Sequence, residues 1–293
     1  MNQTQSIMEW SMFPYLKTAD QLEHYLAERL SGHRYYYHYA GLGAINGILG
    51  GGFCISSVDR FNDHIEKRMF SGREKKYYSP CFSTGEQENL ALWYLYSGVR
   101  GNGGRLQFTY NSVSKLLQSK FRLVEYDYGT HNVLREVAVL TEESAAFSLE
   151  DVLYADKSKK NGNMDIKYNT MTNRGNVSQE EWGKFVDRHK GFQKRQIWYY
   201  EKETRLMIEL SDALYQALDT SKTYAVILTI PNEVMRYVKV RFAPNIGSLE
   251  DPLITQYPKI WALRAASGKL QLSEHAGTVS IDPCRYCTKK QGG

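Results

Sequence analysis

Hydrophobic positions along the chain recur at helical spacing in some segments and alternate with polar positions in others. Thr18-x-x-Gln21 forms a capping box and predicts a helix that ends at Gly32. Ser178-x-x-Glu181 predicts a second helix start of the same kind. Further helices are expected over 42–49, within 59–70 with Asp63 or Asn62 as the cap, over 87–96, from Asn111 to about 118, and over 211–218.

Segments rich in aromatic and β-branched residues predict strands between these helices. The expected strands cover 34–39, 53–57, 105–110, 121–128, 133–140 and 197–210, together with 77–84, which Pro80 interrupts. Thr223–Ile230 is almost continuously apolar, so we expect a central buried strand there. Because strands and helices alternate irregularly, without a repeating βαβ unit, the sequence predicts an α+β fold with mixed central sheets and flanking helices. We expect one domain over 1–293 with a core at about 33–242.

A polar stretch over residues 156–180 interrupts the pattern. It contains Lys157-Ser-Lys-Lys160 and Asn161-Gly-Asn163, and it is longer than most loops inside compact domains. Two interpretations remain open at this point. The stretch is either an insertion that serves as a lid or substrate loop, or a solvated loop without a role.

The composition is that of an ordinary globular protein. The 293 residues are 42% hydrophobic and 24% charged, and the formal net charge is +5. No run approaches the roughly 18 apolar residues of a membrane helix, and residues 1–10 lack the basic and apolar regions of a signal peptide. Four cysteines in a chain of this length suit a reducing compartment better than a disulfide framework. We therefore expect a cytoplasmic protein without membrane contact, whose mild positive charge permits a nucleic-acid partner.

Tyrosine is unusually frequent, with 22 residues gathered at 35–39, 77–78, 94–96, 126–128 and 199–200. The flat face and polar tip of tyrosine suit stacking on nicotinamide, adenine or bases. Tyrosine is also a good strand residue, which explains such clusters without a ligand.

Glu201-Lys-Glu203 is the best lead to chemistry. On a strand, residues two apart point to the same face, so Glu201, Glu203 and Arg205 are expected to lie together. Two carboxylates on one face of a strand flanked by apolar residues are costly unless they are paired or functional. The alternative is an exposed face with an internal Glu203–Arg205 ion pair.

Two other features invite a functional interpretation. His38 lies in the tyrosine-rich strand before a glycine and a short helix, where it could donate to a ribose hydroxyl, although lone histidines are more often structural. Cys284-x-x-Cys287 has the spacing of half a zinc site, but no second pair exists and we expect no metal. Phosphate-binding, dinucleotide-binding, zinc-protease and esterase motifs are absent from the sequence.

Several of these pieces resemble, in order, a large and poorly characterised bacterial domain family. The matching segments are Tyr37-His-Tyr39, Ile48-Leu-Gly-Gly-Gly-Phe53, Asp59-Arg-Phe-Asn-Asp63-His-Ile-Glu66, Cys81-Phe-Ser83, Leu92-Trp93 with Tyr96, and Tyr200-Glu-Lys-Glu-Thr-Arg205. The resemblance covers about residues 35–210. His64, where that family usually has proline, and the stretch 156–180 depart from it.

The same opening resembles the DarT-type ADP-ribosyltransferases, which use NAD to modify DNA bases. That resemblance implies an ADP-ribosyltransferase-like fold and NAD as the co-substrate, with no metal. By the same resemblance His38 would hold the NAD ribose, Arg68 (alternatively Arg60) a phosphate, and Ser83 the nicotinamide side. Glu203 would be the catalytic carboxylate. The Glu-x-Glu spacing also resembles the paired glutamates of arginine-modifying ADP-ribosyltransferases, which makes Glu201 an auxiliary carboxylate. Tyr37, Tyr39 and Phe82 complete the expected cofactor site, and Ala40, where DarT usually has threonine, puts the ribose contacts in doubt.

We therefore expect an NAD-dependent ADP-ribosyltransferase acting on a nucleic acid or protein, such as a bacterial toxin or anti-phage effector with an antitoxin or regulatory partner. Carboxylates suit this reaction because breaking the nicotinamide–ribose bond develops a cation. A non-enzymatic module that binds nucleic acid or another partner is the alternative. A metal-free nuclease or glycosidase using the two glutamates fits less well, because neighbouring positions on one strand do not flank a scissile bond.

Overall fold

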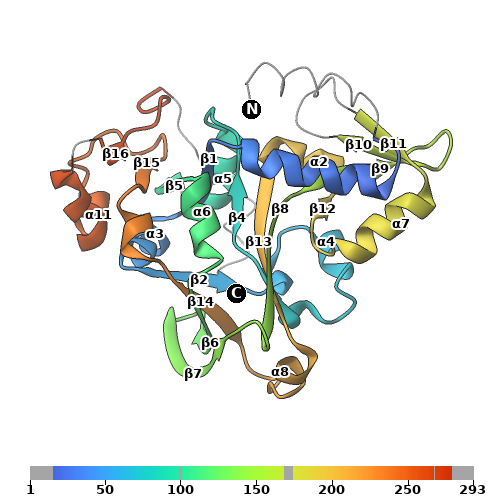
Figure 1. Cartoon of the computed structure of the whole chain (residues 1–293). Coiled ribbons are helices and arrows are strands. Elements are labelled where there is room, and N and C mark those ends of the chain that lie inside the picture. Colours follow the sequence, from blue (N-terminus) through green and yellow to red (C-terminus); the bar gives the residue numbers. More distant parts are fainter. Residues whose placement is uncertain (1–15, 99–100, 168–173, 267, 279–293) are drawn as a thin grey trace, which may run out of the picture.

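The backbone is organised around β-sheets whose strands come from distant parts of the sequence. The computed structural model describes residues 16–98, 101–167, 174–266 and 268–278. Within these ranges the largest sheet has the order β16-β15-β5-β1-β4-β13-β3, and β8 also pairs with β13 (Figure 1). Its strands are β1 (Tyr35–Gly41), β3 (Tyr77–Tyr78), β4 (Cys81–Ser83), β5 (Gly103–Thr109), β8 (Ala145–Asp151), β13 (Glu203–Leu210), β15 (Lys239–Phe242) and β16 (Leu270–Gln271).

A second, antiparallel sheet packs against the first. Its order is β2-β14-β6-β7, with β2 (Gly52–Ser56), β6 (Lys120–Asp127), β7 (Asn132–Leu140) and β14 (Tyr224–Thr229). The prediction of a central buried strand at 223–230 is confirmed, because β14 pairs on both sides and is buried from Tyr224 to Leu228.

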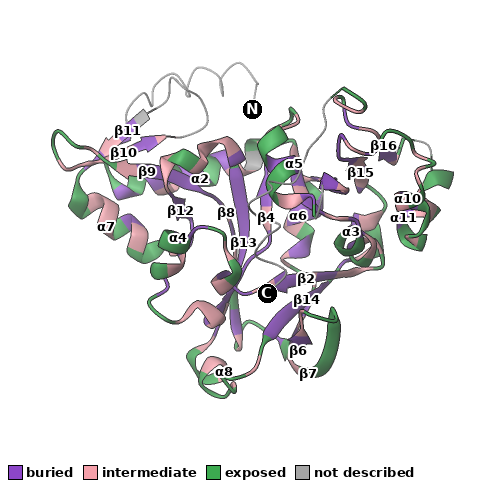
Figure 2. Cartoon of the chain, turned by 180° about the vertical axis from the view of Figure 1, so that it is seen from behind, coloured by how far each residue is buried: buried purple, intermediate pink, exposed green. Residues whose placement is uncertain are grey.

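The main hydrophobic core lies between these two sheets. The large sheet contributes Tyr36, Phe82 and Leu206, and the second sheet contributes Phe53 and Val226, all of which are buried in one cluster. Alternation along each strand places these side chains on the inner faces, as in other packed sheets. Figure 2 shows buried strands at the centre of the molecule, with exposed residues on β7, α8 and α11.

A lobe made by residues 153–194 packs beside the large sheet. It contains a small sheet of order β11-β10-β9-β12 and the helix α7, and helix α2 covers it (Figure 1). Its elements are β9 (Leu153–Lys157), β10 (Met164–Lys167), β11 (Arg174–Val177), α7 (Gln179–Arg188) and β12 (Gln193–Lys194), beside α2 (Ala19–Gly32). Leu22, Leu26, Leu153, Ile166 and Phe185 belong to a separate hydrophobic cluster here. The expectation of a long polar loop at 156–180 is therefore wrong for the described part of that stretch, because its alternating apolar residues form strands.

Short helices connect the strands, and their ends follow from local capping. They are α3 (Leu42–Leu49), α4 (His64–Arg68), α5 (Leu90–Tyr96), α6 (Tyr110–Leu116), α8 (Asp212–Gln216), α9 (Asn232–Met235), α10 (Pro252–Thr255) and α11 (Pro258–Ala262), with 3-10 turns η1 (Val58–Arg60), η2 (Glu74–Lys76), η4 (Gln196–Glu201) and η5 (Leu263–Ala265). The Thr18/Gln21 capping box and the Asp63 cap are both confirmed. No helix in the described ranges is long and apolar enough to cross a membrane.

Other expectations need correction. Thr109, not Asn111, caps α6, and the Ser178 box is half formed because the Glu181 side chain bonds the backbone N–H of Ala19 instead. The expected strand 197–210 begins only at Glu203, since η4 occupies 196–201. Packed elements also extend past the predicted core of 33–242, because Ile254 and Ile260 belong to the main cluster. Cys284 and Cys287 lie outside the described residues.

Candidate functional site

The strand register brings three of the predicted site residues into one row. Tyr37 of β1 lies opposite Ser83 of β4, and Ser83 lies opposite Glu203 of β13. Directly opposed residues in antiparallel strands point to the same face. The sheet therefore has a core face and a polar face, both built from residues 36–40, 81–83 and 203–206. The predicted site residues Ser83 and Glu203 lie on the polar face.

Beside this row, the side chain of His38 on β1 hydrogen-bonds the backbone of β4. Tyr37 and Ser83 are the paired residues of the two strands, and His38 Nδ1 lies 3.0 Å from the carbonyl oxygen of Cys81. A carbonyl can only accept, so Nδ1 carries the proton, and burial lowers the pKa of His38 and favours the neutral ring. The neutral tautomer leaves Nε2 as a hydrogen-bond acceptor on a residue that lines the pocket.

Glu201 and Glu203 are not on one strand, which corrects their expected arrangement. Glu201 is the last residue of η4, and Lys202 turns the chain with a left-handed φ of 45° before β13 begins. The two carboxylates nevertheless meet, because Lys194 Nζ lies 2.5 Å from Glu201 Oε2 and 3.3 Å from Glu203 Oε2. Both glutamates are buried, so the exposed face of the alternative interpretation is wrong, whereas its Glu203–Arg205 ion pair is confirmed.

Glu203 is held as an ion by a fixed set of donors. Arg205 Nε and Nη2 donate to its two oxygens at 2.8 and 2.9 Å, and the Cys81 thiol also hydrogen-bonds it. Burial alone would raise the pKa of Glu203, but the positive charges of Arg205 and Lys194 outweigh it and hold that pKa well below its usual range. With Lys194, these contacts use the roughly four acceptor positions of a carboxylate.

Glu201 has a different environment. Tyr96 Oη–H donates to Glu201 Oε1 at 2.7 Å, and Lys194 binds the other oxygen. Burial and the nearby charge of Glu203 raise the pKa of Glu201, although Lys194 opposes them. Two acceptor positions of Glu201 remain for a ligand.

Lys194 and Glu66 belong to the site but were not predicted from the sequence. Glu66 on α4 accepts from Arg205 Nη1, and Lys194 lies 4.0 Å from Glu66 Oε2. Lys194 comes from β12 in the lobe, and no sequence pattern connects it with residues 201–205. Glu66 is the last residue of the segment Asp59–Glu66 that carries the family resemblance, and this position was the sequence signal that could have identified it as a site residue. Three glutamates and two cations leave the cluster with one negative charge in excess when every group is ionised.

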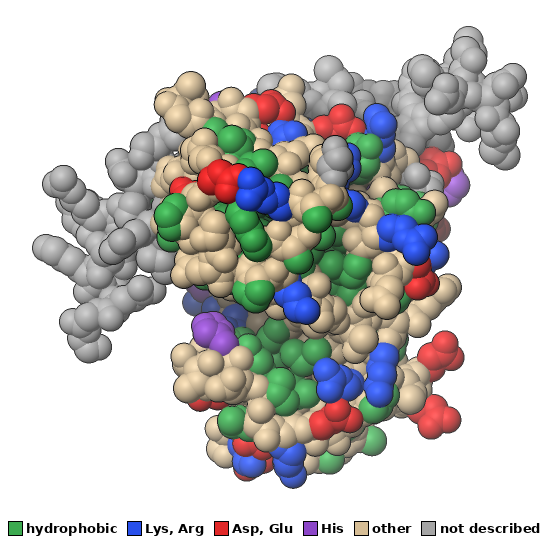
Figure 3. Space-filling model, turned by 90° about the vertical axis from the view of Figure 1, so that its left-hand side faces the viewer, with side chains coloured by type: hydrophobic (Ala, Val, Ile, Leu, Met, Phe, Trp, Pro, Cys, Tyr) green, Lys and Arg blue, Asp and Glu red, His purple; other side chains and the backbone are tan. Residues whose placement is uncertain are grey.

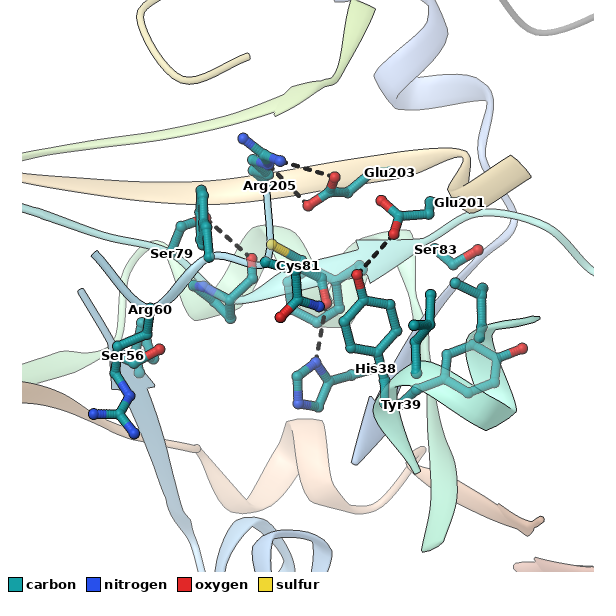
Figure 4. Close-up of a pocket in the computed structure, with 18 of the residues that line it drawn as sticks. His38, Tyr39, Ser56, Arg60, Ser79, Cys81, Ser83, Glu201, Glu203 and Arg205 are labelled. Atoms are coloured by element: carbon teal, nitrogen blue, oxygen red, sulfur yellow. Dashed lines mark hydrogen bonds and ion pairs between the residues drawn. The ribbon is translucent and has the colours of Figure 1, made fainter. Parts of the chain in front are cut away.

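These groups surround a pocket of about 330 Å³, within the size range of small-molecule sites. Figure 4 shows Arg60 and Ser56 at one end of the pocket and Glu201 and Ser83 at the other. The lining also includes Tyr37, His38, Tyr39, Phe53, Cys54, Ile55, Phe61, Asn62, Glu66, Ser79, Pro80, Cys81, Phe82, Leu92, Leu95, Tyr96, Lys194, Glu203 and Arg205. The pocket therefore has an acidic end and a basic end joined by apolar walls.

The basic end belongs to Arg60 and not to Arg68. The Arg60 guanidinium stacks 3.8 Å above the ring of Tyr128, and among the described residues no carboxylate forms an ion pair with it. Arg68 ends α4, is exposed and does not line the pocket. The predicted phosphate contact by Arg68 is therefore not supported, and the alternative, Arg60, has the suitable place.

The rings of Tyr37, Tyr39 and Phe82 line the pocket, but they offer a ligand little open ring face for stacking. Tyr37 and Tyr39 are buried, and the Arg105 guanidinium lies 4.3 Å from the Tyr37 ring centroid and 5.9 Å from that of Tyr39. Phe82 packs in the core beside His38, with ring centroids 6.0 Å apart. These rings shape the pocket wall, but their faces are largely occupied by protein neighbours.

No group of three or more His, Cys, Asp and Glu side chains in the described ranges has the geometry to hold a metal ion. The donor set instead suits an organic ligand with hydroxyl groups, because the acceptor positions of Glu201 and His38 lie in one pocket with the donor Arg60. No family model, curated protein or solved structure matches the chain.

Proposed function

We propose that the chain is an NAD-dependent ADP-ribosyltransferase that works in the pocket between Arg60 and Glu201. The observation that carries this proposal is the convergence of His38, Glu201 and Glu203, taken from segments more than 160 positions apart, on one cavity that also holds Arg60. The resemblance to DarT-type enzymes implies roles for His38 and Glu203, and the Glu-x-Glu spacing resembles the paired glutamates of arginine-modifying ADP-ribosyltransferases. The α+β architecture is compatible with an ADP-ribosyltransferase-like fold.

The charge distribution supports cleavage of a cationic nicotinamide group. In this reaction the C–N bond between ribose and nicotinamide breaks, nicotinamide leaves with the bonding electrons, and a nucleophile on the target bonds to the ribose carbon and loses a proton. Positive charge moves from the pyridinium ring to the ribose as the bond breaks. Buried carboxylates next to that carbon stabilise such charge strongly, because water is largely excluded. The excess negative charge of the cluster suits this requirement.

The two glutamates have different parts in the proposed mechanism. Glu203 has its acceptor positions occupied by Arg205, Lys194 and the Cys81 thiol, so it acts as a fixed negative charge. Glu201 keeps free acceptor positions and contacts the substrate, where it accepts from a ribose hydroxyl or from the incoming nucleophile. Both remain catalytic, but Glu201 is the one that touches the reacting groups.

The remaining contacts orient the dinucleotide. His38 Nε2 accepts from a ribose hydroxyl, Ser83 lies on the nicotinamide side, and Arg60 binds a phosphate oxygen at the opposite end (Figure 4). Because the pocket has the volume of a small ligand, the nicotinamide half enters it and the adenosine half extends past Arg60.

We further propose a nucleic acid or protein as the target and a cytoplasmic role as a bacterial toxin or anti-phage effector, with an antitoxin or regulatory partner. On the face shown in Figure 3, Lys and Arg side chains are scattered among acidic ones around apolar side chains. A target that binds this face would therefore meet apolar side chains and charges of both signs.

Calorimetric titration with NAD and measurement of nicotinamide release test the proposal together. We expect NAD to bind, nicotinamide to be released slowly in water, and Glu201→Gln to abolish release while the protein stays folded. Glu250→Gln, which changes an exposed glutamate paired with Arg264, is the matched control and should behave like the wild type. A folded protein that neither binds NAD nor releases nicotinamide, but binds nucleic acid in a salt-sensitive way, would instead identify the non-enzymatic binding module.

A further inference from the structure

The lobe contacts the glutamate cluster at three points along one seam. The backbone N–H of Glu203 donates to Tyr154 Oη at 2.8 Å, and Arg205 Nη1 donates to the carbonyl oxygen of Gly191 at 2.5 Å. The third point is Lys194. Tyr154, Gly191 and Lys194 come from the beginning and the end of the lobe, because β9 and β12 pair in parallel with Lys194 opposite Tyr154.

The chain approaches the cluster closely at this seam because Gly191 permits it. Its φ of +88° is a conformation that favours glycine, and a Cβ there would lie 2.6 Å from Met207 Cε and 3.1 Å from Phe70 Cζ. The left-handed turn sends the chain back into β12. Lys194 then projects into the pocket three residues later.

Lys194 is the group through which the lobe reaches both carboxylates. Its ammonium group is buried and lies 2.5 Å from Glu201, 3.3 Å from Glu203 and 4.0 Å from Glu66. The Trp198 ring of η4 lies 5.0 Å from the same nitrogen. Because Arg205 binds Glu203 and Glu66 but has no contact with Glu201, Lys194 is the cation that joins Glu201 to the rest of the cluster.

We propose that Lys194 is a positioning residue through which the lobe completes the site, by holding the carboxylates of Glu201 and Glu203 side by side in the pocket. Without the ammonium group these two like charges would repel each other in a poorly solvated place, and Glu201 would take up a proton or turn away. Its catalytic consequence rests on the proposed function, but its electrostatic consequence does not. Tyr154, Gly191 and Lys194, which lie at the two ends of the lobe, thus belong to the proposed site.

Other ionisable groups near Glu201 must be considered in any measurement of its ionisation. The titratable and charged groups that interact with it are Glu203 from β13, Lys194 from β12, Tyr96 from α5, Tyr154 from β9 and the adjacent Tyr200. Arg205 from β13, Glu66 from α4 and Cys81 from β4 line the same pocket and interact with Glu203. Burial raises the pKa of the tyrosines and of the Cys81 thiol, so these groups stay neutral near pH 7. Lys194 is therefore the side chain whose removal most directly changes the charge around Glu201.

Lys194→Met and Lys194→Arg test the proposal in the full chain. We expect Lys194→Met to lower kcat for nicotinamide release by about a hundredfold with little change in KM, and to move the rising limb of the pH profile upward by about one pH unit or more. Lys194→Arg keeps the charge and should keep the limb at its wild-type pH. Lys184→Met removes a lysine of the same lobe that is 51% exposed on α7, and it should leave both quantities unchanged.

Carboxyl titration in the free protein separates this proposal from the proposed function. With ¹³C-labelled glutamate, and Glu201→Gln to assign the resonance, we expect Glu201 to titrate at higher pH in Lys194→Met than in the wild type. If Glu201 titrates identically in both proteins, the positioning role is overturned whether or not NAD is a substrate. If Glu201 shifts as expected but no protein releases nicotinamide, the positioning role stands and the proposed function fails.

Discussion

Replacing each glutamate by the isosteric glutamine should separate their roles in stability from their roles in activity. Arg205 is 1% exposed and has Glu203 and Glu66 as its carboxylate partners. Glu203→Gln removes the charge that Arg205 binds through two parallel hydrogen bonds, and breaking a buried pair in this way costs roughly 3–5 kcal/mol. The glutamine oxygen keeps one of these hydrogen bonds, so we expect the lower end of that range.

Glu201→Gln should cost much less. Its glutamine oxygen can still accept from Tyr96, and Lys194 keeps Glu203 as a partner. The substitution also removes the like charge beside Glu203, so the net loss should stay within about 1 kcal/mol, the value of one hydrogen bond. The two variants are therefore expected to differ by about 2 kcal/mol or more in the free energy of unfolding.

Urea unfolding and nicotinamide release measure the two effects on the same preparations. With an m value of about 3 kcal/mol/M, a loss of about 3 kcal/mol lowers the midpoint for Glu203→Gln by about 1 M. Glu201→Gln should keep its midpoint within about 0.3 M and lose release activity. Equal loss of stability in both variants, or full activity of Glu201→Gln, would refute the division between a fixed charge and a substrate-contacting carboxylate.

Three further predictions concern the basic end of the pocket, the lobe and two glycines. Arg60→Gln should raise KM for NAD about tenfold, because the variant loses a hydrogen bond to a charged phosphate group. Arg68→Gln, at the exposed end of α4, should leave KM unchanged. Steady-state kinetics of the two variants decide between the two arginines. His189 donates hydrogen bonds to the carboxylates of Glu150 and Glu23, and these contacts raise the pKa of His189. The folded pKa of His189 exceeds the unfolded value of about 6.5, so the stabilisation is complete below that value and is lost as the pH rises through the folded pKa. The wild type should therefore exceed His189→Gln in unfolding free energy by up to about 1 kcal/mol at low pH. Urea unfolding should show this difference shrinking between about pH 6 and 9. A Cβ at Gly183 in α7 would meet open space, so Gly183→Ala should raise the unfolding free energy by about 0.5–1 kcal/mol. A Cβ at Gly103 would lie 2.1 Å from the carbonyl oxygen of Ser97, so Gly103→Ala should not fold.

Local signals predicted much of the fold because they act within a few residues. The helix after Thr18, the cap at Asp63 and the interruption of a strand by Pro80 depend on side chains bonding or blocking nearby backbone groups. The buried strand β14 was recognisable because a strand covered on both faces is apolar throughout. In the candidate site, His38 and the two glutamates could be singled out for a similar reason, since ionisable residues among apolar ones are locally conspicuous.

The rest of the site depends on contacts that no local pattern contains. Glu201 and Glu203 were assigned to one strand because alternate residues share a face, but Lys202 turns the chain between them and the carboxylates meet by another route. Lys194 and Tyr154 reach the cluster only because β12 pairs with β9, across about 40 positions. The polar residues at 156–180 concealed this small sheet, whose alternate apolar residues pack under α2.

The excess negative charge of the cluster distinguishes a functional interpretation from a structural one. A buried ion pair is poor evidence for stability, because desolvation of its charges offsets most of their attraction. Arg205 with Glu203 would complete such a pair, but the cluster also contains Glu66, Glu201 and Lys194. When every group is ionised, the additional groups leave one negative charge unbalanced beside a cavity. Burial and the neighbouring carboxylates raise the pKa of Glu66 and of Glu201, so a ligand that carries or develops positive charge at that end would stabilise their ionised forms. Arg60 at the opposite end favours an anion, so the pocket suits one molecule with both properties, as NAD has in its pyridinium and phosphate groups.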